Sequence, residues 1–553
     1  MTQTGASIIV DALCRNGVKT VFGYPGGAVL PLYEELYRNQ HRLEHILCAH
    51  EQNAVHAADG FARASGRPGV VIATSGPGAS NLVTGIATAF LDSVPLVVIT
   101  GNVSVHLQGK DSFQELDTVS LTRSIVKHNF DVASAEELSG IIDAAFFIAC
   151  DGRPGPVVID IPQSVQKACC ESCDFREPLF FSQAPSPVNL KPVAELIAQS
   201  RRPLIYAGGG VVAAGVFQEL EMLAEKMDAP VTFSMMGLSA MGADHPRNAG
   251  MCGMHGTLRS AQLLKECDLL LALGVRFSDR AVGDTEAFRK NKKIIQIDID
   301  RSEINKNVKV DAAVTGDLKE LLPQLLRELS AEERPSWREY ASSFERSEPA
   351  PDPTRLTPRT LIGTVAKHLE EDCLIATDVG QHQMWTMQYF PFKKPRTLLS
   401  SGGLGTMGYG LGAAIGGSVA RGGKRTVLFT GDGSFGMSLQ ELATAVSQKL
   451  PLLICIFNNG VLGMVRQWQN MFYQQHYSHT TLNRQTDFAA LAQAFGAKGV
   501  TVNTPDELEH ALAGLPCDRP AVLDCRLDQD EFVLPMIPPG GSVEDMISSK
   551  EEF

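Results

Sequence analysis

The sequence predicts an α/β protein built from three doubly wound domains, each containing a parallel sheet. Its 553 residues are too many for one hydrophobic core. Short apolar runs alternate with amphipathic helical patterns along most of the chain, which is typical of βαβ units. Two polar stretches rich in proline, serine and charge interrupt this alternation, so we expect them to be linkers.

The first expected domain covers residues 1–166. Its opening segment has polar residues inside an apolar pattern and no basic stretch, which favours an amphipathic helix over an export signal. The strands expected after it are the apolar runs GVVIAT, PLVVIT and GPVVIDIP. Residues 167–188 are the first expected linker, and the cluster of Cys169, Cys170 and Cys173 lies in it as a loop.

Two further domains are expected, over residues 189–330 and 358–530, with a second linker over 331–357 between them. The strands expected in the middle domain are RPLIYAG, PVTFS, DLLLALG and KIIQIDID. Those expected in the last domain are CLIATDVG, RTVLFTGDG, PLLICIFNN and AVLDCRLD. The end of the chain, residues 531–553, is rich in proline and glycine and then acidic, so we expect a C-terminal arm.

Composition narrows the function classes. A net charge of −13 and the lack of any basic run argue against a nucleic-acid-binding protein. Twelve cysteines without repeated ligand spacing favour reduced thiols over a zinc site. The apolar runs are far too short to span a bilayer, so we expect a cytoplasmic protein with no membrane partner.

The motif with the clearest chemistry is GDGSF at residues 431–435, which follows an expected strand, together with the later pair Asn458-Asn459. Asp432 and Asn459 would then lie at the carboxyl ends of neighbouring strands, where open α/β sheets bind ligands. Carboxylate and amide oxygens suit Mg²⁺, and Gly431 and Gly433 would let the backbone approach a diphosphate. A helix expected over SLQELATA would favour the anion at its N-terminus.

Taken alone, GDG is also common in turns that only cap a helix. With the paired asparagines, however, it resembles the diphosphate motif of thiamine diphosphate enzymes. Glu51, in CAHEQNAVHAADGFAR, is similar to the glutamate that exchanges a proton with the cofactor's aminopyrimidine in those enzymes. An isolated glutamate at this place would otherwise be interpreted as stabilising a helix dipole.

Over nearly its whole length, the chain resembles the biosynthetic catalytic subunit of acetolactate (acetohydroxyacid) synthase. The segments that carry the resemblance are GYPGGAVL (23–30), FQE (113–115), GRPGPVVIDIP (152–162), MCGMHGT (251–257), GVRFSDR (274–280), VGQHQMW (379–385), SGGLGTMGYGLGAAIG (401–416) and LGMVRQWQNMFY (462–473). The three domains would then be pyrimidine-binding, central FAD-binding-like and diphosphate-binding.

The resemblance implies a role for particular residues. The implied catalytic residues are Glu51, Gln114, Phe113 and Gly27. The implied thiamine diphosphate contacts are Tyr24, Pro25, Gly26, Gln381, His382, Gly405, Met407, Gly431, Gly433, Ser434 and Met464. The implied FAD contacts are Arg153, Gly208, Gly209, Met254, His255, Gly256, Thr257, Gly274, Arg276, Asp298 and Asp317. The implied metal ligands are Asp432, Asn459 and the backbone carbonyl of Val461, and the substrate pocket is formed by Met464, Trp468 and Arg276.

Three of these side chains have a plain alternative as core residues. Met407 is similar to the bulky residue that holds the cofactor in its bent form, yet a buried methionine is usually only core. Met464 and Trp468 are one helical turn apart and resemble the wall that selects the second substrate, but aromatic residues at that spacing are more often core.

The resemblance implies that pyruvate is decarboxylated and its two-carbon unit is joined to pyruvate or 2-ketobutyrate, in branched-chain amino acid biosynthesis. FAD would be bound without a redox role in this reaction. A homodimer or a dimer of dimers is implied, and the need for a small regulatory subunit is left open.

Two residues depart from the family pattern. Gln163 stands where many members have a basic residue near the pocket mouth, and Ser104 stands where plant relatives commonly have proline. The first leaves open how anionic keto acids are drawn in, and the second concerns inhibitor sensitivity.

The rival functions are pyruvate oxidase, a catabolic acetolactate synthase, a nicotinamide-dependent oxidoreductase and an inactive regulatory homologue. GVRFSDR resembles the flavin signature that the catabolic relatives lack, and no GxGxxG with a following acid is present for a nicotinamide site. Glu51 argues against glyoxylate carboligase, and the intact set of Glu51, Asp432 and Asn459 argues against an inactive homologue.

Overall fold

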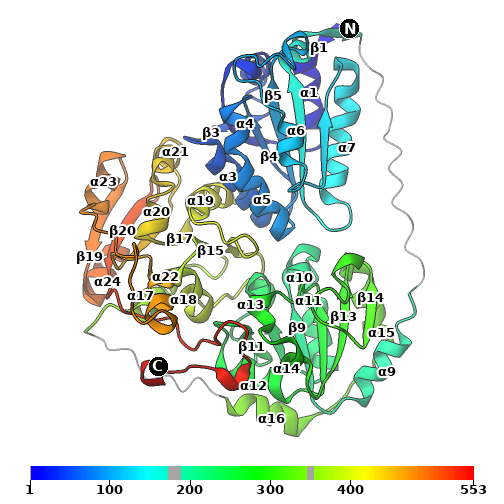
Figure 1. Ribbon diagram of the computed structural model, residues 1–553, viewed down its shortest axis with the longest axis vertical. Coiled ribbons are helices and arrows are strands. Elements are labelled where there is room, and N and C mark those ends of the chain that lie inside the picture. The colour runs from blue at the N-terminus through cyan, green and yellow to red at the C-terminus, as the bar shows by residue number, and fades with distance from the viewer. Residues whose placement is uncertain (1, 172–187, 345–353, 553) are drawn as a thin grey trace.

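The structure is a computed structural model that describes residues 2–171, 188–344 and 354–552. It contains three α/β units, each with a six-stranded parallel sheet covered by helices (Figure 1). In Figure 1 the N-terminal unit is blue to cyan at the top, the central unit is green at the lower right, and the C-terminal unit is yellow to red at the lower left. The predicted fold class is confirmed.

The N-terminal sheet has the strand order β3-β2-β4-β5-β7-β6. Its strands are β2 (Thr20–Tyr24), β3 (Glu44–Leu47), β4 (Gly69–Ala73), β5 (Leu96–Asn102), β6 (His128–Asp131) and β7 (Pro156–Pro162). The helices around it are α1 (Gly5–Arg15), α2 (Leu30–Arg38), α3 (Glu51–Ser65), α4 (Pro77–Asn81), α5 (Val83–Asp92), α6 (Thr118–Thr122), α7 (Leu138–Cys150) and α8 (Gln163–Lys167), with 3-10 turns η1 (Gly27–Val29), η2 (Val105–Leu107) and η3 (Ala135–Glu137). Every residue of β4, β5 and β7 is buried, as expected for strands covered on both faces.

The central sheet has the strand order β11-β10-β9-β12-β13-β14. Its strands are β9 (Pro203–Ala207), β10 (Val231–Phe233), β11 (Asn248–Met251), β12 (Leu269–Leu273), β13 (Lys293–Asp298) and β14 (Ala312–Thr315). Its helices are α9 (Lys191–Gln199), α10 (Gly209–Ala214), α11 (Phe217–Lys226), α12 (Leu258–Glu266), α13 (Asp279–Val282), α14 (Thr285–Arg289), α15 (Leu318–Glu328) and α16 (Pro335–Ser343), with 3-10 turns η4 (Met235–Ala240) and η5 (Arg301–Glu303).

The C-terminal sheet has the strand order β16-β15-β17-β18-β20-β19. Its strands are β15 (Leu374–Thr377), β16 (Leu398–Leu399), β17 (Thr426–Gly431), β18 (Leu453–Asn458), β19 (Lys498–Val502) and β20 (Ala521–Arg526). Its helices are α17 (Pro358–Lys367), α18 (Gln381–Tyr389), α19 (Tyr409–Ala420), α20 (Asp432–Phe435), α21 (Leu442–Ser447), α22 (Gly463–Phe472), α23 (Phe488–Ala494) and α24 (Pro505–Ala513), with 3-10 turns η6 (Leu439–Glu441), η7 (Val543–Asp545) and η8 (Lys550–Glu552).

The two expected linkers contain more structure than their composition predicted. Cys169 and Cys170 belong to a short strand, β8 (Cys169–Glu171), which pairs antiparallel with β1 (Thr2–Thr4), while Cys173 lies outside the described residues. In the second stretch, α16 packs on the central unit through the buried Trp337, whose indole N–H donates to the carbonyl of Pro203 at 2.8 Å. Residues 172–187 of the first stretch and residues 345–353 of the second lie outside the described residues.

The C-terminal arm crosses from its own unit to the central one. Val533 N donates to the side chain of Gln467 at 2.9 Å, and further along Ile537 N donates to the carbonyl of Met254 at 2.8 Å. Gly541 then accepts from Asp284 N at 3.0 Å. The arm therefore ties the C-terminal unit to the central unit. Among the described residues, no helix combines the length and the apolar character needed to cross a membrane.

The N-terminal and C-terminal units meet where α3 crosses α19. Both helices are rich in Gly and Ala, and every residue from Tyr409 to Ser418 is buried. A Cβ on Gly416 would collide with the carbonyl oxygen of Ala57, and one on Gly60 would collide with the carbonyl oxygen of Ala413. The two backbones can approach this closely only because these positions lack side chains.

We predict that Gly416→Ala destabilises the protein by about 1–3 kcal/mol, the usual cost of overpacking a tight contact. The control is Gly363→Ala in α17, where an added Cβ meets no atom within 4 Å. That control is expected to be neutral or to stabilise by up to about 1 kcal/mol, because alanine is the better helix former. Denaturant unfolding of both variants measures the difference, and equal midpoints for the two would contradict the proposed close crossing.

Candidate active site

A large cavity, with a volume of about 1470 Å³, lies where the three units meet, and the N-terminal unit lines it with residues 91–93 and 152–154. Ordinary ligand pockets span roughly 300–1,000 Å³, so this one has room for more than one small molecule. The central unit contributes the loops that follow β9, β12 and β13, and the C-terminal unit contributes the loop before α19 and one face of α22. Open α/β sheets bind ligands at these carboxyl ends of their strands.

Two of the three expected metal ligands, Asp432 and Asn459, line a smaller cavity of about 290 Å³, whereas Val461 is not among its lining residues. Asp432 directly follows β17 and is the first residue of α20. Asn459 directly follows β18, which pairs with β17. The Asp432 carboxylate accepts from Gly460 N at 3.1 Å, and burial raises the pKa of Asp432 to about 6. A divalent cation at this carboxylate would offset that cost of burial, so the donor atoms suit Mg²⁺.

The two neighbouring asparagines have different roles. Asn458 is the last residue of β18, and its amide donates to Asp524 on β20 at 2.7 Å, which is a structural contact. Asn459 follows in the turn, where its Nδ2 lies 3.3 Å from Oε1 of Gln381 and its Oδ1 accepts from Val461 N at 3.3 Å. Asn459 and Val461 therefore belong to one turn beside Asp432.

The described residues contain no cluster of three or more His, Cys, Asp or Glu side chains that could hold a metal alone. This fits an ion that binds a diphosphate, because Mg²⁺ usually takes only one or two carboxylates and fills its other positions with phosphate oxygens and water.

The backbone at Gly431 packs closely against the ring of His382. A Cβ at Gly431 would come within 2.9 Å of the His382 ring. Nε2 of His382 is buried and has no hydrogen-bond partner among the described residues, so it can serve a bound group. Ser434 is close by in the same turn, and its hydroxyl donates to the carbonyl of Val379 at 3.2 Å.

The segment SLQELATA is helical, as the 3-10 turn η6 from Leu439 and then α21 from Leu442. A separate four-residue helix, α20, begins earlier, directly at Asp432. The backbone N–H groups closest to Gly431 in the chain therefore belong to α20. That the N-terminus of the helix over SLQELATA favours an anion stays a prediction.

Glu51 is the first residue of α3 in the N-terminal unit. Its Oε2 accepts from Asn81 Nδ2 at 2.9 Å. Just before it, Ala49 N donates to both oxygens of the buried Glu441 carboxylate, at 3.0 and 3.1 Å. The position of Glu51 is thus fixed by one residue from its own unit and one from the C-terminal unit. Neither Asn81 nor Glu441 was predicted from the sequence.

The other implied catalytic residues lie in loops of the N-terminal unit. Gln114 has a φ of 60°, an uncommon backbone conformation for a non-glycine residue, and Phe113 beside it is 88% exposed. Gly27 opens η1, directly after Tyr24, Pro25 and Gly26 at the end of β2. Glu51 and these residues line neither the large nor the small cavity. One chain therefore divides the implied site residues into two separate sets.

Most of the implied flavin positions surround the large cavity. Its lining includes Arg153, Gly209, Met254, His255, Gly274, Arg276, Asp298 and Asp317. Arg153 is held by Glu303 at 2.8 Å and Asp300 at 3.1 Å, and burial raises the pKa of Asp298 to about 6.

The remaining three implied flavin positions, Gly208, Gly256 and Thr257, are not among the lining residues. A Cβ on Gly208 would collide with Gly274 O, so this glycine permits two cavity loops to pack together. Thr257 caps α12, because its hydroxyl accepts from Ser260 N at 3.2 Å.

Two of the three implied substrate-pocket residues lie on α22 and face the large cavity. Met464 and Trp468 both line the large cavity, as do Met407 and Gly405 from the loop before α19. A further residue, Arg280, places its guanidinium carbon 5.1 Å from the centre of the Trp468 ring. The resemblance implied Arg276 as the arginine of the substrate pocket. Only the fold shows that Arg280, the second arginine of GVRFSDR, lies over the Trp468 ring.

Comparison with known protein families agrees with this arrangement. The family described as "Thiamine pyrophosphate enzyme, N-terminal TPP binding domain" matches residues 3–121, its central domain matches 190–325, and its "C-terminal TPP binding domain" matches 378–525. The "Acetolactate synthase isozyme 2 large subunit" of Escherichia coli is 44% identical over 99% of both chains. The chain belongs to the acetolactate synthase large-subunit family.

Other acetolactate synthase relatives are similar over comparable lengths. The "Probable acetolactate synthase large subunit" of Methanocaldococcus jannaschii is 45% identical over 98% of this chain and 95% of its own. The "Acetolactate synthase large subunit" of Pyropia yezoensis is 41% identical over 99% of this chain and 95% of its own. As a member of this family, the chain is a thiamine diphosphate enzyme.

We predict that Asp432→Ala abolishes binding of thiamine diphosphate with Mg²⁺. Among the described residues, Asp432 is the only acidic residue that lines the smaller cavity, and the substitution removes its carboxylate. The control is Asp528→Ala in the same unit, whose carboxylate is exposed and pairs with Arg355 at the surface. Calorimetric titration of both variants measures the effect. Unchanged binding in Asp432→Ala would show that GDGSF is only a turn that caps a helix.

Proposed function

We propose that this protein decarboxylates pyruvate with thiamine diphosphate and joins the two-carbon unit to pyruvate or 2-ketobutyrate. The products would be 2-acetolactate and 2-aceto-2-hydroxybutyrate, in the first common step of branched-chain amino acid biosynthesis. The observation that carries this proposal is the set of Met407, Met464 and Trp468 in the wall of the large cavity, together with Asp432 and Asn459 in the wall of the smaller one. We further propose that the protein acts in the cytoplasm.

The chain's own residues would bind, orient and exchange protons. When bound, thiamine diphosphate supplies the carbon nucleophile that attacks the keto group and carries the two-carbon unit. Asp432 and Asn459 would hold Mg²⁺ at its diphosphate, and Met407 would support its bent conformation. Glu51 would exchange a proton with the aminopyrimidine nitrogen, and Asn81, which donates to Glu51 Oε2, would keep that carboxyl oriented.

The second keto acid would bind between α22 and the loop that carries Arg280. Its carboxylate needs a cation, and Gln163, which stands where many family members have a basic residue, instead donates to the carbonyl of Gly27 at 2.8 Å. Arg280 lines the cavity with its guanidinium carbon 5.1 Å from the centre of the Trp468 ring, which supports it as the cation that binds the substrate carboxylate. The indole of Trp468 would then contact the alkyl end of the same substrate.

The part of the large cavity in the central unit would bind FAD. Its glycine-flanked loops after β9 and β12 suit a pyrophosphate, and Arg153 and Arg276 supply positive charge. Nδ1 of His255 is buried without a partner among the described residues, which supports a ligand there. The proposed reaction transfers no electrons to acceptors, so FAD would have a structural role.

A homodimer would complete the site. Glu51, Gln114, Phe113 and Gly27 of the N-terminal unit do not line the cavity, and several large apolar side chains of the same unit are exposed: Tyr24, Leu30, Leu47, Val105, Leu107 and Phe113. We propose that these side chains form the interaction site, because large exposed apolar surface marks such sites. Glu51 of one copy would thus meet the cavity of the second copy. The relatives are named large subunits, which supports a small regulatory partner as well.

The overall proposal is tested by incubating the purified protein with pyruvate, thiamine diphosphate and Mg²⁺, with and without FAD, and identifying the product. We expect 2-acetolactate, and the mixed product when 2-ketobutyrate is added. Consumption of oxygen or phosphate with formation of acetyl phosphate would instead identify a pyruvate oxidase.

Mixing two inactive variants tests the shared site. Glu51→Gln and Asp432→Ala chains, after subunit exchange, should together recover about a quarter of the wild-type sites. Half of the dimers would be mixed under random pairing, and each mixed dimer would have one intact site. Mass spectrometry of differently labelled chains verifies the exchange. Exchange without any recovered activity would sink the shared-site proposal.

We predict that Trp468→Leu removes most of the preference for 2-ketobutyrate over pyruvate as the second substrate. One methylene in an apolar pocket provides about 1–3 kcal/mol of discrimination, or roughly 10–200-fold. Decarboxylation of the first pyruvate should change little, because it depends on Glu51. The product ratio under competition between the two keto acids is the measurement. An unchanged ratio would mean that Trp468 is only a packing residue.

A further inference from the structure

The loop of residues 400–408, between β16 and α19, carries Met407 into the large cavity. Four of its residues are glycines, and two of them, Gly405 and Gly408, have φ values of 72° and 85°. Glycine-rich segments have many accessible conformations, so this loop needs outside contacts to hold one of them.

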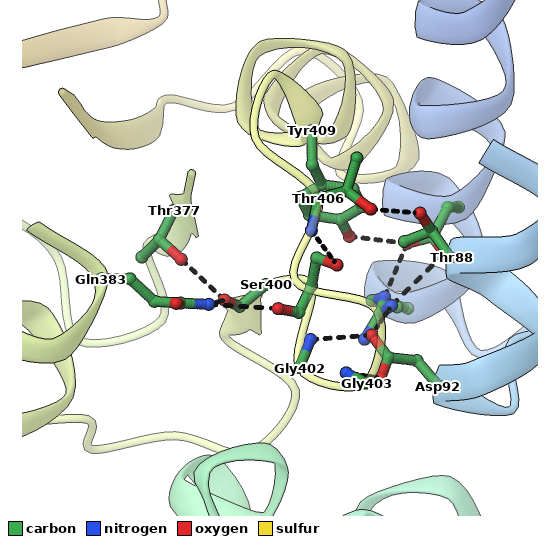
Figure 2. Close-up of polar contacts among 12 residues, drawn as sticks. Thr88, Asp92, Thr377, Gln383, Ser400, Gly402, Gly403, Thr406 and Tyr409 are labelled. Atoms are coloured by element: carbon green, nitrogen blue, oxygen red, sulfur yellow. Dashed lines mark hydrogen bonds and ion pairs between the residues drawn. The ribbon is translucent and has the colours of Figure 1, made fainter. Parts of the chain in front are cut away.

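Its own unit holds the first two residues of the loop (Figure 2). The hydroxyl of Ser400 lies 2.7 Å from that of Thr377 and accepts from the Gln383 amide at 2.9 Å. The hydroxyl of Ser401 accepts from Thr406 N at 3.0 Å and so closes the loop on itself. Among the described residues, no side chain of the C-terminal unit forms a hydrogen bond with the tip of the loop, from Gly402 to Gly405.

The tip is instead held by α5 of the N-terminal unit. The Asp92 carboxylate accepts from Gly402 N at 3.0 Å and from Gly403 N at 2.6 Å, one bond to each oxygen. Nearby, the hydroxyl of Thr88 lies 2.7 Å from that of Thr406. Figure 2 shows the side chains of Thr88 and Asp92 pointing from α5, in blue, toward the yellow loop.

Asp92 is itself fixed by buried charges. Its side chain is fully buried, and Arg63 donates to it at 2.8 Å. Arg63 also pairs with Asp59 at 2.6 Å, and Asp59 accepts from the hydroxyl of Tyr409, the first residue of α19, at 2.6 Å. The cluster therefore holds the tip of the loop and the start of the helix that follows it.

The fit at the tip is close. A Cβ on Gly403 would lie 2.9 Å from both Asp92 Oδ1 and Leu91 Cβ, so the backbone can approach the carboxylate only as glycine. Gly402, Gly403 and Asp92 all line the large cavity. The carboxylate thus acts at the cavity wall and not at a remote surface.

We propose that Asp92 is a positioning residue, which holds the 400–408 loop in the conformation that presents Met407 to thiamine diphosphate. The inference rests on the proposed function for the role of Met407, but the contact itself does not. It also gives the N-terminal unit two separate tasks: Asp92 acts on the cavity of its own chain, whereas Glu51 would act on that of a second copy.

The test compares Asp92→Asn with Asp143→Asn in the full-length protein. Asp143 is also a buried aspartate paired with an arginine, Arg15 at 2.8 Å, but it lies between α1 and α7. An asparagine at position 92 cannot accept from both glycine amides and Arg63 at once. Hydrogen exchange of residues 400–408 is measured without cofactor, and thiamine diphosphate with Mg²⁺ is then titrated by tryptophan fluorescence.

For Asp92→Asn we expect exchange of the loop amides to rise, and affinity for thiamine diphosphate to fall, each by roughly tenfold or more, as lost charge-assisted hydrogen bonds imply. Asp143→Asn should change neither. The proposal is overturned if either quantity stays at the wild-type value in Asp92→Asn, or if Asp143→Asn matches it. Failure of the proposed function would appear separately, as wild-type protein that binds the cofactor but makes no acetolactate.

Discussion

The buried contact between α3 and α19 determines how the N-terminal and C-terminal units are placed, and with them both parts of the site. Gly60 and Gly416 let the helices approach, while Arg63 lies between two carboxylates, Asp59 and Asp92. Burial raises the pKa of Asp59, so the cluster is stable only because each carboxylate also accepts from further donors. Those donors come from the C-terminal unit: the Tyr409 hydroxyl and the amides of Gly402 and Gly403. Shape and charge therefore select the same orientation.

The three sheets could be predicted from the sequence because parallel strands covered on both faces need continuous apolar runs. The same reasoning anticipated that Asp432 and Asn459 follow adjacent strands, and β17 does pair with β18. The pairing of β1 with β8 could not be predicted, since three-residue strands have no measurable period. The helix α16 could not be predicted either, because its segment is mostly polar. Its buried Trp337 packs on the central unit and donates to the carbonyl of Pro203, which stabilises the helix there.

The site was only partly predictable, for a different reason. Motif spacing predicted Asp432, and the family resemblance predicted Glu51 and Trp468. Side-chain direction decides between near neighbours, however, and direction depends on the fold. Asn458 and Asn459 are adjacent and both line the smaller cavity, yet the amide of Asn458 donates to Asp524 on the next strand, whereas that of Asn459 donates to Gln381. Asp92 ends a helix and looks unremarkable in sequence, because the amides it binds are 310 and 311 residues further along the chain.

The division of site residues within one chain links assembly to catalysis. Phe113 is 88% exposed in a single chain, and burying a large apolar side chain is worth about 1.5–3 kcal/mol. Further large apolar side chains of the same unit are exposed, so covering them with a second copy would be favourable. It would also remove water from the Glu51 carboxyl, which we propose exchanges a proton. The C-terminal unit, in contrast, has its loop conformation set within its own chain by Asp92. A chain could therefore bind the diphosphate end of the cofactor before it dimerises, but the proton-exchanging glutamate would reach the ring only afterwards.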